Sequence, residues 1–136
     1  MAERMRPMQI AWLAGLLEGE GCFGFSHHIF IALGMTDRDT VAKVAALLNT
    51  KLRGPYRPSR GNKDMYYTTA YGYKAASWMM ILFSFLSVRR RAVICEALGK
   101  WKQQKVQRSL NVESLKDGKQ NPAYRRAYRE ARRAHG

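Results

Sequence analysis

Residues 7–21 form the segment that most constrains what this chain can fold into. The segment reads PMQIAWLAGLLEGEG, with a proline suited to a first helical turn and a glycine at its end, which predicts a helix. On a helical wheel, bulky aliphatic residues occupy one side, and Ala11, Gly15 and Gly19 line the other. Each interior glycine costs about 0.5–1 kcal/mol relative to alanine, so close packing must offset that cost.

The small-residue face of this helix has two interpretations. Small residues at every fourth position let two helices approach closely, so the partner could be a second copy of the same helix. The other interpretation is burial inside the chain's own domain, and periodicity alone does not separate the two. The same helix ends in Glu18 and Glu20, where the macrodipole disfavours anions by about 0.3–1 kcal/mol each. A carboxylate there is either a solvated helix end or a ligand for a divalent metal held against phosphate.

The charge balance points to a polyanionic partner. The chain has 136 residues, with 24 Lys and Arg against 10 Asp and Glu and a formal net charge of +14. Hydrophobic residues make up 46% of the chain, enough for one domain with a modest core rather than a disordered chain. Most of the surplus lies in residues 89–136, with 14 basic residues against 4 acidic ones. Nucleic acid is therefore the expected partner class.

The cysteines and the apolar runs argue against a disulfide-bonded, zinc-binding or membrane-spanning protein. Cys22 and Cys95 lie far apart without a zinc-like or C-x-x-C spacing, so neither a disulfide framework nor a zinc site is indicated. No apolar run approaches the roughly 18 residues that span a bilayer, and the first apolar stretch lacks a signal-peptide cleavage site. We expect an intracellular protein, cytoplasmic or at a nucleoid or organelle, with no membrane partner.

Hydrophobic periodicity and turn signals predict an α+β fold with the order α-β-β-α-β-β-α and further helices. The predicted elements are a helix at 7–21, strands at 22–25 and 29–33, a helix at 36–49, strands at 53–59 and 65–72, an apolar segment at 74–86 and a helix at 89–107. The apolar run 78–85 is interpreted as core. We expect one domain over residues 1–107, and a polar connector with a basic C-terminal helical tail over 108–136.

The run 13–21, LAGLLEGEG, resembles the signature of the LAGLIDADG homing endonucleases, and Trp12 and the pair 22–23 beside it are also typical of that family. The resemblance covers about residues 8–105 and includes residues 35–37 and 85–91, which each enter a helix. It implies the family's fold, with a curved antiparallel sheet that binds DNA. It also implies a site-specific double-strand DNA endonuclease that uses Mg²⁺, with Mn²⁺ also suitable. Genes of this family are commonly mobile and encoded in introns, inteins or phage genomes.

The resemblance also assigns site residues by position. Glu20 matches the motif's final acidic residue, which coordinates the catalytic metal, and Gly19 matches a ligand through its backbone carbonyl. Glu18 matches the other acidic position of the motif. Arg89 stands where the family usually has a lysine that assists at the scissile phosphate, and an arginine there stabilises an anion but does not readily exchange a proton. Met35 stands where some members carry a water-ordering glutamine. The expected catalytic residues are Glu20 and Arg89.

The single motif implies a symmetric homodimer on a near-palindromic target, because a two-fold dimer presents the same surface twice. The expected dimer interface comprises Ala11, Ala14, Gly15, Glu18 and Gly19. Because the family's sheet reads the major groove, the expected sheet contacts to DNA are Arg53, Arg57, Arg60, Lys63, Tyr67 and Tyr71. The further expected DNA contacts are His28 in the first hairpin, Arg38 at the start of the second helix, and Arg125, Arg126 and Arg129 in the tail.

Two alternatives remain open for this sequence. The first is a catalytically inactive relative that binds nucleic acid, either as an intron RNA splicing factor or as a DNA-binding regulator. Met35 and Arg89 keep this alternative open, and it adds intron RNA to the expected partners, double-stranded DNA and a second copy. The second is a basic structural DNA-binding or membrane-surface protein whose motif helix is only core.

Overall fold

The computed structural model describes residues 6–57, 63–120 and 122–135. The chain divides into two compact units, Met1–Trp101 and Lys102–Gly136. None of the described helices is long and apolar enough to cross a membrane.

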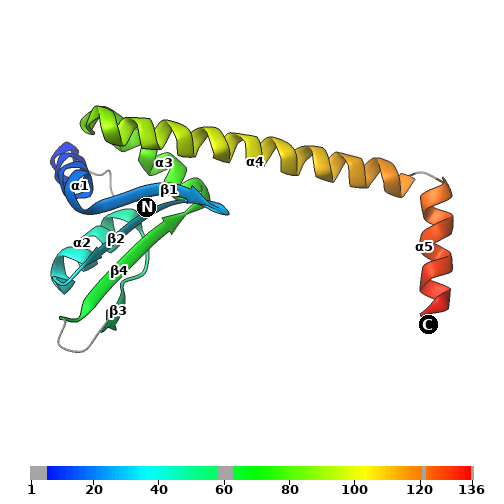
Figure 1. Ribbon diagram of the computed structural model, residues 1–136, viewed down its shortest axis with the longest axis horizontal. Coiled ribbons are helices and arrows are strands. Elements are labelled where there is room, and N and C mark those ends of the chain that lie inside the picture. The colour runs from blue at the N-terminus through cyan, green and yellow to red at the C-terminus, as the bar shows by residue number, and fades with distance from the viewer. Residues whose placement is uncertain (1–5, 58–62, 121, 136) are drawn as a thin grey trace. The chain divides into compact units, whose positions relative to one another are not determined.

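The first unit contains a four-stranded antiparallel sheet and the helices that cover it (Figure 1). The chain order is α1 (Pro7–Glu20), β1 (Gly21–Ser26), β2 (His28–Met35), α2 (Arg38–Leu48), β3 (Arg53–Tyr56), β4 (Met65–Tyr71), α3 (Gly72–Leu82), the 3-10 turn η1 (Phe83–Phe85) and α4 (Val88–Gln120). The second unit holds the remainder of α4 together with α5 (Pro122–Ala134).

The sheet has the order β1-β2-β4-β3, with two hairpins joined through β2 and β4. In the central pairs, Phe23 lies opposite Ile31, and Ile31 lies opposite Ala70. Alternate residues of these strands are buried, because side chains alternate between the two faces of a strand. Helices α1, α2 and α3 contact the face that carries the buried residues. Among the described residues of this unit, the opposite face carries the strand residues that are exposed or half-buried, and we call it the open face.

The core of the first unit is aliphatic. It joins the bulky side of α1 to the covered face of the sheet and to one side each of α2, α3 and α4. Its largest fully buried side chains are Leu13, Leu17, Ile29, Ile31, Leu33, Val41, Val44, Leu48, Thr68, Met79, Leu82 and Ile94. The hydroxyl of buried Thr68 is hydrogen-bonded to that of Thr50, which satisfies the one polar side chain in this set.

The structure confirms the α+β fold and the alternation of helices and hairpins expected from the sequence. Residues 108–120, expected as a polar connector, instead continue α4. This segment mixes good helix formers such as Leu, Lys, Glu and Gln with Ser, Asn, Asp and Gly, so its polar composition alone does not distinguish an exposed helix from a loop.

The interpretation of run 78–85 as core is wrong for part of the run. Met79 and Leu82 are fully buried, whereas Met80, Ile81 and Phe85 are about half exposed. A single helix such as α3 directs only every third or fourth residue to the sheet, so the residues between them cannot reach the core. The run therefore contains more apolar side chains than the first unit buries.

Helix α2 begins at Arg38, two residues later than the expected start at residue 36. Its N-cap is Asp37 rather than Thr36, and the Asp37 carboxylate accepts hydrogen bonds from the backbone N–H of Asp39 and the hydroxyl of Thr40. The Thr40 hydroxyl is the main cause that lowers the pKa of Asp37 below its ordinary value of 3.8. The N-terminus of α2 therefore carries a fixed negative charge, which suits the positive end of the helix dipole.

Candidate functional site

Helix α1 passes into strand β1 without a loop, and Gly21 makes this possible. A Cβ atom at Gly21 would lie 2.7 Å from the carbonyl oxygen of Leu17 and 2.8 Å from its side chain. The Gly21 N–H donates to that same carbonyl and closes the helix. Only glycine fits this junction, and the junction places Glu20 at the last residue of α1, directly before β1.

Arg90 of α4 is held against the carboxyl end of α1. Its Nε and Nη2 atoms donate to the Glu18 backbone carbonyl at 3.1 and 2.9 Å, and Nε lies 3.9 Å from the carboxylate oxygen Oε2 of Glu18. The guanidinium also lies over the ring of Phe23, with 5.8 Å between its Cζ atom and the ring centroid. A cation at a helix C-terminus is stabilising, so Arg90 compensates the acidic end of α1.

Glu18 is a structural acid in this arrangement. Its Oε2 atom is shielded from solvent and has no hydrogen-bond partner among the described residues. The side chain as a whole is 33% exposed, and the nearby charge of Arg90 stabilises the shielded oxygen. Glu18 is therefore tied to α4.

Glu20 differs from Glu18 in being exposed. Within the described residues it has no ion-pair partner within 4.0 Å. The described residues also contain no group of three His, Cys, Asp or Glu side chains that could hold a metal ion. Mg²⁺ is typically bound through one or two carboxylates together with substrate oxygens and water. The Glu20 carboxylate and the Gly19 carbonyl have the hard-oxygen chemistry that such a metal requires.

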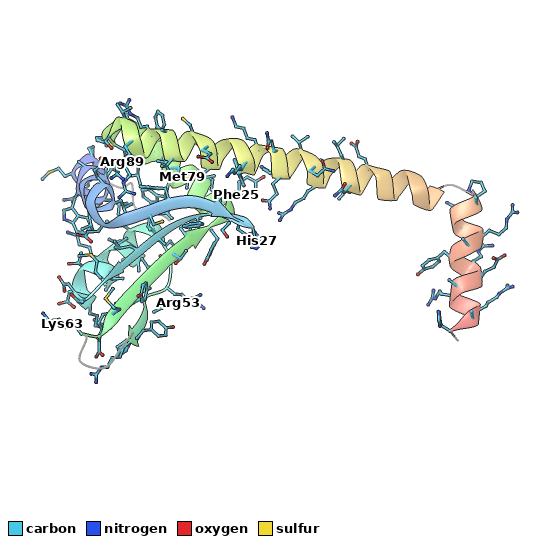
Figure 2. The ribbon with its side chains drawn as sticks, in the orientation of Figure 1. Phe25, His27, Arg53, Lys63, Met79 and Arg89 are labelled. Atoms are coloured by element: carbon cyan, nitrogen blue, oxygen red, sulfur yellow. The ribbon has the colours of Figure 1, made fainter. Side chains whose placement is uncertain are left out.

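The sequence pointed to Arg89, but Arg90 is the arginine that the structure holds at the end of α1. Arg89 is exposed at the start of α4 (Figure 2). Three successive arginines occupy residues 89–91, and they point 100° apart around the helix. Only the rotation of α4 against α1 selects among them, and no local signal in the sequence reveals that rotation.

The small-residue face of α1 is exposed in the part of the chain that the structure describes. Ala11, Gly15 and Gly19 are exposed, and a Cβ atom built at either glycine would meet no atom within 4 Å. Met8 at the start of the same face is 83% exposed. The alternative that this face packs inside its own domain is therefore wrong.

Ala14 does not belong to that exposed face. It is 1% exposed and packs in the core with Leu13 and Leu17. The reason is its position on the helix, since residue 14 lies 100° from residue 15 and turns toward the sheet. The expectation that Ala14 contributes to a dimer interface is corrected accordingly.

The open face of the sheet carries several aromatic rings. The ring of Tyr67 lies across Gly34 on the neighbouring strand, because a Cβ atom at Gly34 would lie 2.5 Å from that ring. The ring of Phe30 covers Gly24 in the same way, with 2.8 Å to the built Cβ. Tyr56 and Tyr67 face each other with ring centroids 5.9 Å apart. This face therefore presents flat ring surfaces on a glycine-lined sheet.

The structure brings four of the expected DNA contacts to this open face. Their positions in the strand register place Arg53, Tyr67, Tyr71 and His28 on the face opposite the core. Arg53 lies directly opposite Tyr67.

The other expected contacts lie elsewhere. Arg57 follows β3 and pairs with Asp64 at 3.1 Å, and Lys63 is exposed in the same hairpin (Figure 2). Arg60 lies outside the described residues. Arg38 opens α2 in the helical layer and lies 3.6 Å from Asp39, so the structure does not place it on the open face of the sheet.

The second unit carries a separate basic surface on α5. The arginines of this helix share one side and are exposed at residues 125, 126, 129, 132 and 133. Alanines and tyrosines at spacings of three and four residues occupy the other side, including Ala127, Tyr128 and Ala131. The expected contacts Arg125, Arg126 and Arg129 thus lie together on an amphipathic helix.

No family model and no curated protein sequence matches the chain. Solved structures do match. One is the homing endonuclease I-CvuI in complex with its target in the presence of Ca, with a TM-score of 0.55 and 17% identity over 70% of this chain and 66% of that chain. This chain has the homing-endonuclease fold. A second match, with a TM-score of 0.55, 18% identity and the same coverage, is I-CvuI in complex with the I-CreI target in the presence of Mg, with its DNA not cleaved.

The α1–β1 junction and the open sheet face both belong to the part of this chain that has the homing-endonuclease fold. The chain spans just under two thirds of the I-CvuI chain. The fold expectation from the sequence is confirmed by this match. The match concerns the fold, and the description of the residues at the end of α1 comes from the geometry of this chain.

Proposed function

We propose that the protein is a site-specific double-strand DNA endonuclease that acts as a symmetric homodimer on a near-palindromic target. The observation that carries this proposal is the exposure of one face of α1. That helix buries its bulky side, leaves Gly15 and Gly19 uncovered, and ends in exposed Glu20. A net charge of +14 and the DNA complexes of the matched homing endonuclease support DNA as the substrate.

The dimer proposal follows from the small-residue face. Two α1 helices can approach closely only where neither carries a large side chain, and Ala11, Gly15 and Gly19 meet that condition. An isologous pairing would bring the two copies of Glu20 near the symmetry axis. Each copy would then face one strand of the duplex.

A divalent metal, Mg²⁺ or Mn²⁺, would be held by the Glu20 carboxylate and the Gly19 carbonyl. Such a metal supplies Lewis-acid chemistry to phosphodiester hydrolysis by polarising the phosphoryl oxygen and stabilising the leaving oxygen. Arg89, exposed beside this end of the fold, would place positive charge near the scissile phosphate. Arg90 would act as a positioning residue through its bonds to the Glu18 carbonyl.

The open sheet face would enter the major groove on each side of the axis. Tyr67 and Tyr71 are 37% and 58% exposed and offer apolar surface to thymine methyl groups and hydroxyls to phosphates. The guanidinium fork of Arg53 matches either a guanine edge or a phosphate. The α5 arginines would add backbone contacts that do not depend on sequence.

The test is cleavage of a randomised palindromic duplex library by the purified full chain. We expect Mg²⁺-dependent cuts that disappear with Ca²⁺ or EDTA, and sequencing of the cut ends reports the target. The variant Glu20→Gln should bind the same target without cutting it, because it keeps the size of the side chain and removes its charge. Equal cutting by Glu20→Gln would exclude Glu20 from the reaction.

The binding-only relative is the second candidate, and two observations favour it. Met35 is half buried against the core. Its thioether is only a weak hydrogen-bond acceptor, so it cannot take the water-ordering role that a glutamine has in some family members. The aromatic open face also suits stacking on unpaired bases, which is how proteins recognise single-stranded RNA. Under this proposal the library would be bound selectively and never cut, and structured intron RNA would compete with duplex DNA.

A further inference from the structure

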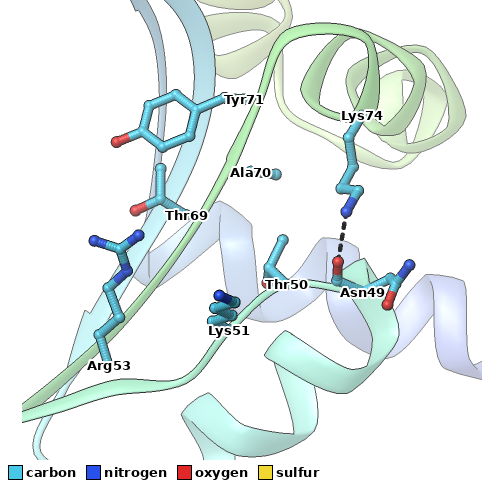
Figure 3. Close-up of a pocket in the computed structure, with 8 residues that line it drawn as sticks. All are labelled: Asn49, Thr50, Lys51, Arg53, Thr69, Ala70, Tyr71 and Lys74. Carbon is cyan, nitrogen blue, oxygen red and sulfur yellow. Dashed lines mark hydrogen bonds between the residues drawn. The ribbon is translucent and has the colours of Figure 1, made fainter.

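A basic pocket lies at the edge of the sheet where β3 separates from β4. It has a volume of about 530 Å³. Strand β3 pairs with β4 at Arg53 and Tyr56, so the last residues of β4 extend beyond the described pairing. The wall is completed by the connection from α2 to β3 and by the first turn of α3 (Figure 3). The lining residues are Asn49, Thr50, Lys51, Arg53, Thr69, Ala70, Tyr71 and Lys74.

The described lining of this pocket contains three cations and no carboxylate. Lys51 and Arg53 are exposed, and neither has a carboxylate within 4.0 Å among the described residues. Lys74 is anchored, since its Nζ atom donates to the Asn49 backbone carbonyl at 2.6 Å. Like charges gathered without a counter-charge repel one another, and a bound anion removes that repulsion.

Two further features of the pocket suit an anion with several oxygens. Figure 3 shows the guanidinium of Arg53 and the hydroxyl groups of Thr69 and Tyr71 on one side of the β4 ribbon, and the ammonium groups of Lys51 and Lys74 on the other. Helix α3 begins between Tyr71 and Lys74 and has no side-chain N-cap, so its first backbone N–H groups add partial positive charge nearby. Hydroxyls, ammonium groups and a guanidinium are the donors that bind phosphate.

We propose that this pocket binds a phosphate group and that Lys51, Arg53 and Lys74 anchor it. Its position favours a backbone phosphate of duplex DNA as the source. The pocket borders the open face of the sheet, and when a sheet face lies in a groove, the strand backbone runs along its edges. Arg53 then fixes the register of the protein on the duplex and does not read a base.

The duplex arm of the test rests on the proposed function, and it measures affinity against salt concentration. Binding of the full chain to a random-sequence duplex is compared between wild type and the double variant Lys51→Ala, Arg53→Ala. Losing one phosphate contact should reduce the slope of log affinity against log salt by about one unit. It should also weaken binding about threefold or more at moderate salt, equally for all sequences. The control Lys100→Ala removes an exposed lysine paired with Glu96 outside the pocket and should leave the slope unchanged.

The second arm uses inorganic phosphate and does not depend on nuclease activity. We expect amide signals of Thr69, Tyr71 and Lys74 to shift when phosphate, but not chloride, is added to the wild type, and to stay in place in the double variant. If the amide signals shift on addition of phosphate but the double variant has the salt slope of the wild type, the phosphate site is supported and its ligand is free phosphate rather than DNA. An unchanged slope together with unmoved amide signals overturns the proposal. Absence of cleavage by the wild type would overturn the nuclease proposal and leave this site intact.

Discussion

At the scale of single residues, the arrangement around the end of α1 depends on Arg90. One guanidinium satisfies the Glu18 carbonyl, offsets the Glu18 carboxylate and covers the ring of Phe23. Glu20, two residues further along, is exposed and unpaired among the described residues. Two carboxylates of one motif therefore have different environments, which separates a structural acid from one that is available to a ligand.

The first prediction concerns Arg90→Ala. It leaves the Glu18 carbonyl without its side-chain donor and removes the charge that lies near the shielded Glu18 oxygen. A buried polar group without a partner costs about 1–3 kcal/mol. Urea unfolding should therefore show a loss of that size. Arg89→Ala is the matched control, because it removes an exposed arginine and should change stability by less than about 0.5 kcal/mol while lowering cleavage. Equal stability of the two variants would contradict the role assigned to Arg90.

At the scale of elements, α1 is a helix whose two sides have different partners. The bulky side packs on the sheet, and no described residue covers the glycine side. The sequence predicts both sides from residue spacing, yet it cannot tell whether a small-residue face meets the same chain or another copy. The fold shows that this face does not pack in the core of its own domain.

The second prediction compares two glycines that both have open space for a side chain. Gly15→Leu should stabilise the isolated chain by about 0.5–1 kcal/mol, because leucine is a better helix former, and should break the dimer by blocking close approach. Gly99→Leu in α4 should stabilise the chain by a similar amount and leave the dimer intact. Sedimentation equilibrium and urea unfolding at low protein concentration measure the two effects. A dimer that survives Gly15→Leu excludes the α1 face as the interface.

The third prediction concerns the N-cap of α2. Because the Thr40 hydroxyl lowers the pKa of Asp37, the stability that this carboxylate provides is present above pH 3.8 and is lost as pH falls through the lowered folded-state pKa. Thr40→Ala should move the pKa of Asp37 back toward 3.8, and a carboxyl carbon titration by NMR measures that shift. The variant Asp37→Asn should not show this loss of stability as pH falls, because an amide does not titrate. An unchanged Asp37 pKa in Thr40→Ala would show that the Thr40 hydroxyl does not cause the shift.

At the scale of the whole molecule, the order of helices and strands was predictable because β1, β2, β4 and α2 have a clear hydrophobic period and turn signals separate the elements. The position of Glu20 was predictable because the motif is long. Two features were not predictable. The extension of α4 to Gln120 has a polar composition that suits an exposed helix and a loop equally. The choice of Arg90 over Arg89 depends on how α4 is rotated against α1, which is a property of packing rather than of local sequence.

The fourth prediction concerns the basic helix α5. Replacing Arg125, Arg126 and Arg129 by alanine should reduce the salt slope of duplex binding by about two to three units if each contacts a phosphate. Replacing Lys100, Lys102 and Lys105 of α4 removes the same charge from another helix and serves as the control. A slope equal to that of the wild type would exclude α5 from the DNA interface.

The most direct test of the central claim is cleavage by a mixed dimer of one wild-type chain and one Glu20→Gln chain. The chains carry different affinity tags, so the mixed dimer is isolated and tested on the target found in the library. If each Glu20 serves one strand across an α1–α1 interface, the wild-type dimer cuts both strands, the doubly substituted dimer cuts neither, and the mixed dimer only nicks one strand. Cutting of both strands by the mixed dimer, or failure of the two chains to associate, would contradict the account.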